Sequence, residues 1–161
     1  MRILVYGYGN PGRQDDGLGV ELVTRLEAWA VDRQLAGVEF ENNYQLNIED
    51  AEAISHQDVV IFVDASQEDL DDFCLSEVDG QGKLSFTTHA ASPGYIFKLC
   101  QTLFEKAPRV LLLHIKGYEW EFQEGLSERA ALNLERAFDY MKKILLNPEI
   151  VTASKEGLKL C

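Results

Sequence analysis

Three apolar runs along the chain are typical of buried strands. They are residues 3–6, 58–64 and 109–115, and each is rich in valine, isoleucine or leucine. Continuous apolar runs of this kind predict strands that are covered on both faces of a sheet. Two shorter segments, 38–41 and 73–78, predict further strands. Residues 84–88 are expected to be extended or loop-like.

Between these runs the apolar residues recur at helical spacing. The first such stretch begins with Val20, Val23 and Leu26 and predicts a helix that runs to about residue 33. Further helices are predicted over residues 48–56, from Pro93 to a stop at Pro108, and over residues 127–146. The residues expected to cap these later helices at their N-termini are Asn47, Ser92 and Ser127.

The alternation of helices with buried strands predicts the fold class. A chain built in this way forms a three-layer α/β domain, with a doubly wound, mostly parallel sheet, helices on both faces and one short antiparallel strand. Residues 1–161 are expected to form a single domain, because this length suffices for one sizeable core. From about residue 147 the pattern weakens, which predicts a tail that is either frayed or docked.

The segment from Gly7 to Gly19 is the first candidate for chemistry. It follows the first buried strand, contains glycines that permit tight turns, and leads into the first helix. In open α/β sheets ligands bind outside the carboxyl ends of the strands. The adjacent carboxylates Asp15 and Asp16 therefore lie where chemistry is usually placed.

Two other interpretations of this loop stay open. Residues 7–12 match a dinucleotide-binding fingerprint, with Glu41 where the ribose-binding acid would stand. Against that interpretation, Asp15 and Asp16 at the helix entry would repel a phosphate group. Alternatively, one aspartate only caps the helix, which leaves the other aspartate and the long loop unexplained.

Composition limits the possible partners. The net charge of −12 repels nucleic-acid backbones and anionic membrane surfaces, and it attracts a basic partner. No apolar run approaches the roughly 20 residues that span a bilayer, and the run before Gly7 is too short for a signal peptide, so the chain is expected in the cytoplasm. Cys74, Cys100 and Cys161 are widely spaced, which favours reduced thiols over a disulfide framework or a thiolate zinc site.

Asp16, Asp64 and His89 form a candidate metal site. If strands 3–6 and 58–64 are neighbours, Asp16 and Asp64 project over the same edge of the sheet, and His89 belongs to a loop that reaches that edge. Carboxylate oxygens and an imidazole nitrogen suit nickel, zinc, manganese or iron. Spacing alone is a weak signal, because turn capping would also explain Asp64 and a backbone hydrogen bond would also explain His89.

The remaining chemistry-bearing residues favour structural roles. His56 ends a polar helix, and His114 lies in a strand where a hydrogen-bonded histidine is expected. No serine lies in a nucleophile elbow and no cysteine has an evident basic partner. Tyr118, Trp120 and Phe122 alternate with glutamates, so their rings either pack on the core or line a peptide groove.

Four motifs together resemble the hydrogenase maturation endopeptidases. In chain order they are Gly7-Tyr8-Gly9-Asn10 with Asp15-Asp16-Gly17-Leu18-Gly19, the strand ending Val63-Asp64-Ala65, Thr88-His89 followed by Pro93, and Gly125-Leu126-Ser127 before the last helix. The resemblance extends from Met1 to about Leu146. Some members have glutamate where Asp16 stands, and some carry a glycine-rich turn where this chain has Asn42-Asn43-Tyr44-Gln45, which leaves the client protein open.

The resemblance implies a phosphorylase/hydrolase-like fold and an endopeptidase activity. The expected reaction removes the C-terminal extension of a nickel-iron hydrogenase large-subunit precursor after nickel insertion. Asp16, Asp64 and His89 are the implied metal contacts, with nickel delivered within the precursor and zinc or another divalent ion substituting on purification. The alternatives are a nickel-dependent chaperone that binds the precursor without cutting it, and a dinucleotide-binding oxidoreductase.

The implied hydrolysis leaves one role undecided. A metal-polarised carbonyl or a metal-bound water would serve the reaction. The proton acceptor would be Asp15 or one of the ligand carboxylates. Asp15 therefore joins Asp16, Asp64 and His89 as a candidate catalytic residue.

Overall fold

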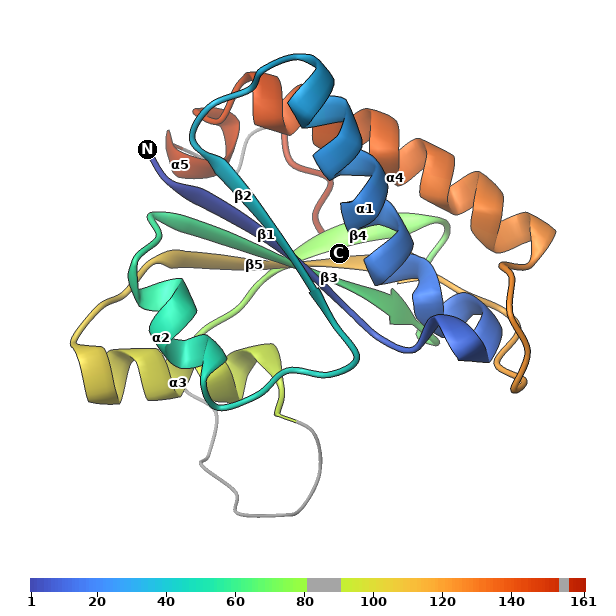
Figure 1. The fold of residues 1–161 in the computed structure, drawn as a ribbon, viewed down its shortest axis with the longest axis horizontal. Coiled ribbons are helices and arrows are strands. Elements are labelled where there is room, and N and C mark those ends of the chain that lie inside the picture. Colours follow the sequence, from blue (N-terminus) through green and yellow to red (C-terminus); the bar gives the residue numbers. More distant parts are fainter. Residues whose placement is uncertain (81–90, 154–156) are drawn as a thin grey trace.

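A five-stranded sheet forms the centre of the molecule in the computed structural model, which describes residues 1–80, 91–153 and 157–161 (Figure 1). The strands are β1 Ile3–Tyr8, β2 Val38–Asn43, β3 Val59–Ser66, β4 Phe73–Glu77 and β5 Arg109–Lys116. Their order across the sheet is β2-β1-β3-β5-β4. All neighbouring strands are parallel except β4, which pairs antiparallel with β5 at one edge. The predicted mostly parallel sheet with one short antiparallel strand is confirmed.

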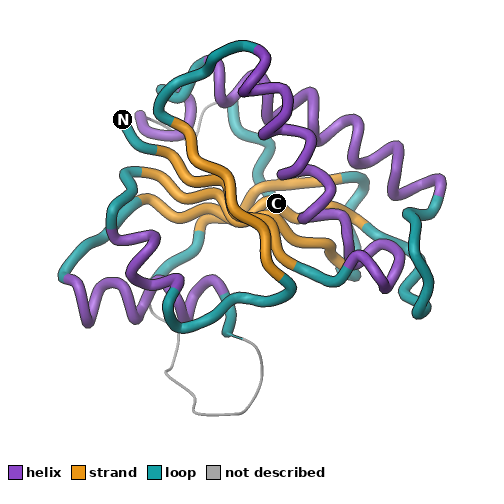
Figure 2. The backbone as a smooth tube through the Cα atoms, viewed as in Figure 1, coloured by secondary structure: helices purple, strands orange, loops and turns teal. Residues whose placement is uncertain are grey.

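Helices cover both faces of this sheet, as Figure 2 shows. The helices are α1 Leu18–Asp32, α2 Asp50–Ser55, α3 Pro93–Phe104, α4 Glu128–Leu146 and α5 Ile150–Ala153. α1 and α4 pack together on one face, and α2 and α3 pack together on the other. This arrangement confirms the three-layer, doubly wound architecture. None of the helices in the described residues combines the length and the apolar character that crossing a bilayer requires.

Alternation along the central strands builds two cores. In β1, Ile3 and Val5 belong to the cluster beneath α1 and α4, whereas Leu4 and Tyr6 belong to the cluster beneath α2 and α3. Successive side chains of a strand point to opposite faces, so a strand covered on both sides must be apolar throughout. The continuous apolar runs of the sequence follow directly from this geometry.

The predicted N-caps of the two long later helices are confirmed. Ser92 accepts a hydrogen bond from the backbone N–H of Tyr95 at the start of α3 (3.1 Å), and Ser127 accepts one from Ala130 at the start of α4 (3.2 Å). In both cases the hydroxyl group satisfies one of the backbone donors that a helix start leaves free.

Two predicted helix boundaries are wrong. α2 begins at Asp50 without a side-chain cap from Asn47; instead the Asp50 carboxylate accepts a hydrogen bond from the backbone N–H of Asn47 (2.7 Å). α3 ends at Phe104, well before Pro108, because Glu105 adopts the left-handed backbone conformation with φ of 53°. A left-handed residue of this kind ends a helix without the help of a proline.

The C-terminal segment is docked, and the prediction of reduced thiols is wrong for two of the three cysteines. Cys74 in β4 and Cys161 form a disulfide, with their Cα atoms 5.0 Å apart. The backbone of Leu75 donates to Lys159 (2.7 Å) and accepts from Cys161 (2.8 Å). The two cysteines are 87 positions apart in sequence, and only the docking of the tail beside β4 brings them together. Cys100, which lies in α3, is a buried free thiol, as predicted.

Candidate functional site

The carboxyl ends of β1 and β3 bring the first loop and Asp64 together. β1 and β3 are parallel neighbours, with Gly7 opposite Val63, so Asp64 follows directly at the edge where β1 ends. The chain leaves β1 through Gly9 and enters a 3-10 helix, η1 (Pro11–Gly17), before α1 begins. The carboxylate of Asp16 in η1 turns back toward β1 and accepts a hydrogen bond from the backbone N–H of Asn10 (2.8 Å).

Two glycines make this close approach possible. Gly9 has φ of 136°, and a Cβ atom there would lie 2.1 Å from the carbonyl oxygen of Asp16. At the start of α1, a Cβ atom on Gly19 would lie 2.3 Å from the carbonyl oxygen of Val63. Any larger residue would push η1 and α1 away from the strand ends, so these glycines hold the loop against the site.

The electrostatic environment of Asp64 is unusual. Its pKa is raised to about 7, first because the carboxyl group is buried and then because the negative charge of Asp16 lies nearby. Hydrogen bonds from the Tyr8 hydroxyl and from the backbone of Ala65 act in the opposite direction. Perturbed carboxyl groups of this kind cluster at functional sites, because burial and like charges are costly elsewhere. The effect of the Asp16 charge on Asp64 shows that the two carboxylates lie near each other at one edge of the sheet, as predicted.

Tyr8 is a site residue that the sequence pattern did not single out. Its hydroxyl group is hydrogen-bonded to Asp64, and burial together with the charges of Asp64 and Asp16 raises its pKa. Its ring packs edge-on against Phe62 of β3, with the ring centroids 6.4 Å apart. The available signal is its position between Gly7 and Gly9, where β1 gives way to the loop.

The third predicted ligand, His89, lies outside the described residues. Of the three predicted metal contacts, the structure therefore describes the surroundings of two, Asp16 and Asp64. Within residues 1–80, 91–153 and 157–161 no group of three histidine, cysteine, aspartate or glutamate side chains is arranged to hold a metal ion. The donor set of the described site is two carboxylates, a chemistry that suits a hard or borderline divalent cation.

Asp15 has a different environment from its neighbour. Its side chain is fully buried, and its carboxylate accepts hydrogen bonds from the backbone N–H groups of Tyr118 (2.7 Å), Glu119 (2.9 Å) and Ser127 (2.8 Å) and from the Ser127 hydroxyl (2.7 Å). Burial alone would raise its pKa, but these hydrogen bonds outweigh burial and lower it. The geometry gives Asp15 a structural role, and it offers no support for the predicted role as proton acceptor.

The same contacts join η1 to the loop between β5 and α4. The backbone N–H of Gln14 donates to Gln123 (2.9 Å), and the Gln14 side-chain oxygen accepts from the backbone of Glu121 (2.9 Å). Gln14 is buried and has φ of 46° with ψ of −115°, a positive-φ conformation that is uncommon outside glycine. The loop after β5 therefore holds η1, and with it Asp16, in place.

Two aromatic residues of this loop lie in different environments. Tyr118 packs against the core, accepts a hydrogen bond from the Asn133 side chain (2.9 Å) and lies beneath the Arg129 guanidinium group. Phe122 is 84% exposed, and the Arg13 guanidinium group lies 4.9 Å from the centre of its ring. One ring thus stabilises the fold and another faces solvent.

The other predicted alternatives for the first loop and the histidines are now decided by contacts. Gly12 lies within η1, and α1 begins only at Leu18, so the glycines do not lead straight into the N-terminus of an α-helix as a dinucleotide fingerprint requires. Nε2 of His114 lies 2.7 Å from the Ser76 hydroxyl, and burial lowers its pKa. His56 is exposed and pairs with Glu52 (3.2 Å). Both histidines have the structural roles that the sequence predicts.

Several solved structures with the same fold are described as hydrogenase maturation proteases. The chain is similar to the [NiFe] hydrogenase maturation protease HycI from Thermococcus kodakarensis KOD1, with 23% identity, a TM-score of 0.70 and coverage of 91% of this chain and 93% of that one. It is similar to the hydrogenase maturating endopeptidase HybD from E. coli, with 20% identity, a TM-score of 0.67 and coverage of 92% and 94%. An endopeptidase from Escherichia coli matches with 20% identity, a TM-score of 0.68 and coverage of 99% and 96%.

These likenesses establish the fold over nearly the full length of the chain. No family model matches the sequence, and no curated protein sequence matches it significantly. The expected resemblance to hydrogenase maturation endopeptidases is thus confirmed for the three-dimensional fold, although these sequence comparisons find no match.

Proposed function

We propose that this protein is an endopeptidase that removes the C-terminal extension of a nickel-iron hydrogenase large-subunit precursor after nickel insertion. The observation that carries the proposal is the pairing of Asp16 with Asp64 at the carboxyl edge of this fold. Both carboxylates come from motifs that resemble the maturation endopeptidases, and the pKa of Asp64 is raised by its burial and, in addition, by the repulsive negative charge of Asp16 nearby. A divalent cation between them would relieve that repulsion.

Nickel is, in this proposal, cargo of the substrate. The ion already inserted in the precursor contacts Asp16, Asp64 and His89, and this contact places the scissile bond at the site. A divalent ion held by these residues would supply Lewis-acid chemistry to the hydrolysis. Zinc or another divalent ion of similar ligand preference occupies the same residues when the protein is purified without precursor.

The chain's own residues supply orientation and a proton acceptor. Tyr8 holds the Asp64 carboxyl group through its hydroxyl, and the backbone of Asn10 holds Asp16. Asp15, which is fully occupied by four hydrogen bonds, keeps η1 in position. Of the predicted proton acceptors, the ligand carboxylates are therefore preferred over Asp15.

A processing assay tests the proposal. Purified protein is mixed with nickel-loaded and with nickel-free large-subunit precursor from the same organism, and the precursor C-terminus is read by mass spectrometry. We expect cleavage of the nickel-loaded form alone, and at least 100-fold slower cleavage by Asp16→Asn and Asp64→Asn, in line with the usual effect of removing a group that acts on the reacting atoms. His89→Ala extends the same test to the third predicted contact.

The control variant is Glu149→Gln, which changes one exposed charge just before α5, away from η1 and β3, and should process normally. Folding of every variant is verified by circular dichroism. Normal processing by folded Asp16→Asn and Asp64→Asn would contradict the proposed site. Nickel-dependent binding without cleavage would replace the endopeptidase with a chaperone.

A further inference from the structure

β2 is the outermost strand on one side of the sheet, and nothing in the described part of the chain pairs with its outer edge. Ile3 N–H donates to Gly37 (2.9 Å) and Gly9 N–H donates to Asn43 (3.1 Å), at the two ends of the β1–β2 pairing. Because the direction of hydrogen bonding alternates along a strand, the backbone groups of the even-numbered residues point away from β1. These residues are Val38, Phe40 and Asn42. Such a row of free donors and acceptors is a template for another extended chain.

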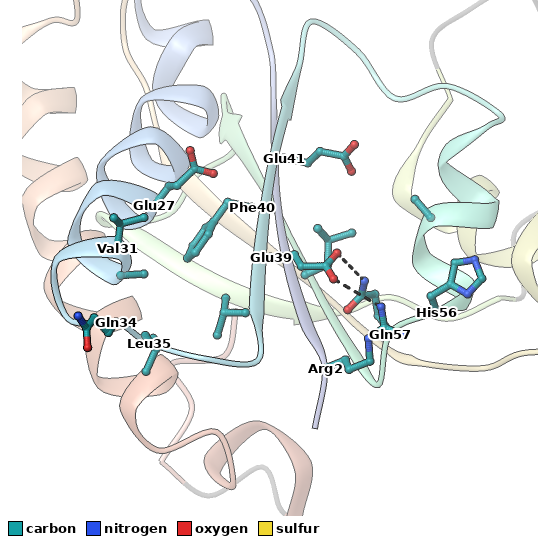
Figure 3. A pocket seen from close by; sticks show the side chains of 14 residues that line it. Arg2, Glu27, Val31, Gln34, Leu35, Glu39, Phe40, Glu41, His56 and Gln57 are labelled. Carbon is teal, nitrogen blue, oxygen red and sulfur yellow. Dashed lines mark hydrogen bonds and ion pairs between the residues drawn. The ribbon is translucent and has the colours of Figure 1, made fainter.

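A hollow of about 610 Å³ follows this edge (Figure 3). On the α1 side it is lined by Phe40 of β2 together with Val31 and Leu35, and Val31 is 69% exposed. On the α2 side Figure 3 shows the carboxylates of Glu39 and Glu41. The edge therefore has an apolar side and an acidic side. Because successive side chains of a strand point to opposite faces, a bound strand with alternating apolar and basic residues would match both sides.

The two glutamates differ in whether a positively charged side chain lies beside them. Glu39 pairs with Arg2 (3.5 Å) and accepts a hydrogen bond from Gln57 (3.1 Å). For Glu41, no cation among the described side chains lies within ion-pair distance, and burial together with the charges of Asp50 and Glu39 raises its pKa. An added positive charge beside Glu41 would be stabilised by this surplus of carboxylates.

The charge of the edge argues against a second copy of this chain as its occupant. In an edge-to-edge dimer, Glu39 and Glu41 of two subunits would meet in one sheet, and each subunit has a net charge of −12. Like charges opposite one another in a sheet are destabilising, and charged side chains on edge strands commonly prevent self-association. A basic strand from another protein meets no such repulsion.

The edge leads to the candidate active site. β2 ends at Asn43, whose carbonyl group accepts the hydrogen bond from Gly9, and Gly9 lies in close backbone contact with Asp16. An extended segment that pairs along β2 thus arrives, at the carboxyl end of the sheet, beside the loop that carries Asp16. Proteins that bind peptides by strand addition gain affinity from the main chain and specificity from alternate side chains.

We propose that the outer edge of β2 binds an extended segment of the protein substrate in which basic residues alternate with apolar ones. The identity of the partner rests on the proposed endopeptidase function. The segment adds a strand to the sheet through the backbone groups of Val38, Phe40 and Asn42. Its basic side chains lie over Glu39 and Glu41, and its apolar side chains fill the α1 side of the hollow.

The first test uses a synthetic probe, a capped eight-residue peptide in which lysine alternates with leucine. Titration into ¹⁵N-labelled protein should shift the amide signals of Val38, Phe40 and Asn42 and slow their hydrogen exchange. Two further peptides are N-methylated, one at the lysines and one at the leucines. In a strand paired with β2, the N–H groups of every second peptide residue donate to β2 and the others point away. Methylation of the donating N–H groups should therefore abolish binding, and methylation of the others should not. Equal binding of both would overturn the proposal.

The second test changes the charge of the edge. The double variant Glu39→Gln/Glu41→Gln should weaken peptide binding by about fivefold, the size expected for two partly exposed ion pairs. Glu149→Gln removes the same kind of exposed charge just before α5, outside the lining of the hollow, and should leave binding unchanged. A peptide with glutamate in place of lysine should bind at least about tenfold more weakly than the lysine peptide. Unchanged affinity of the double variant would contradict the charge match.

The third test separates this inference from the proposed function. With nickel-loaded precursor, the double variant should raise KM about fivefold and leave kcat unaltered, because the edge binds substrate and does not touch the reacting atoms. Normal processing with an unchanged KM would overturn the docking edge and leave the endopeptidase intact. Peptide binding at β2 without any precursor cleavage would support the docking edge and contradict the endopeptidase function. A dimer in sedimentation analysis with protected β2 amides would assign the edge to a second copy.

Discussion

Two neighbouring aspartates of one short helix illustrate how strongly position decides the chemistry of a side chain. Asp15 is surrounded by hydrogen-bond donors, which lower its pKa and fix it as an anion inside the protein. Asp16 turns toward β1, where its charge helps to raise the pKa of Asp64. The first carboxylate stabilises the fold, and the second adds negative charge beside the buried Asp64 carboxyl group, an arrangement typical of functional sites.

Replacing Asp64 should stabilise the protein at neutral and alkaline pH. An acid whose pKa is about 7 in the folded state holds a proton that the unfolded chain, with its ordinary pKa near about 4, has already released. The contribution of Asp64 to stability is therefore greatest below about pH 4 and is lost as the pH rises toward 7. Asp64→Asn should consequently have a higher Tm than the wild type at pH 8 and a similar Tm at pH 4.5, in thermal unfolding followed by circular dichroism.

Asp72→Asn provides the opposite control. Burial would raise the pKa of Asp72, but its hydrogen bond with Lys159 and other contacts lower it, so its contribution to stability is present above the pKa of the unfolded chain and lost in acid. Asp72→Asn should therefore lower the Tm at pH 8. An Asp64→Asn variant less stable than the wild type at pH 8 would contradict the raised pKa of Asp64, which burial and the nearby charge of Asp16 cause.

At the scale of elements, η1, the loop after β5 and the start of α4 form one hydrogen-bonded unit. Ser127 links η1 to α4, because its hydroxyl group donates a hydrogen bond to Asp15 and accepts one from the first turn of α4. The helix cap is therefore also an anchor for the loop that carries Asp16. Stabilising α4 and positioning the site are two results of the same contact.

Ser127→Ala should cost more stability than an ordinary cap substitution. Loss of the cap costs about 1 kcal/mol, and loss of a hydrogen bond to a charged group adds about 1.5–3 kcal/mol. Ser92→Ala, which removes only the cap of α3, is the matched control and should cost about 1 kcal/mol. Urea unfolding of both variants gives the comparison, and equal losses would show that the Asp15 contact adds nothing.

At the scale of the whole molecule, the two edges of the sheet are treated differently. The β4 edge is covered by the C-terminal segment, which pairs with Leu75 and is tied by the Cys74–Cys161 disulfide. The β2 edge is left open and carries Glu39 and Glu41. A covered edge cannot recruit another strand, whereas an open, charged one can do so selectively.

Removing the disulfide should loosen the covered edge. Cys161→Ser should lower the free energy of unfolding by about 2–4 kcal/mol, the usual contribution of a disulfide that restricts the unfolded chain. The Leu75 amide, which donates to Lys159, should exchange its hydrogen faster. A reductant should reproduce both effects in the wild type and change nothing further in Cys161→Ser. Unaltered unfolding of the reduced wild type would show that the tail docks without the covalent bond.

The sheet and its layers could be predicted because local pattern and global fold agree. The runs at 3–6, 58–64 and 109–115 carry apolar residues on both faces, and a parallel sheet between helices is the arrangement that buries these residues. The meeting of Asp16 and Asp64 followed from the same logic, since parallel neighbours end at one edge. The part played by Tyr8 could not be predicted, because it depends on the local direction of one side chain.

The sequence by itself determined the architecture of this protein, the caps of α3 and α4, and the edge of the sheet at which its acidic residues gather, because periodicity and turn chemistry act over a few residues. Only the tertiary structure decided the role of Asp15, whose partners lie more than 100 positions away. The same holds for the Cys74–Cys161 bond and for the open edge of β2. These features depend on which distant segments pack together, and that choice follows from the burial of the whole core.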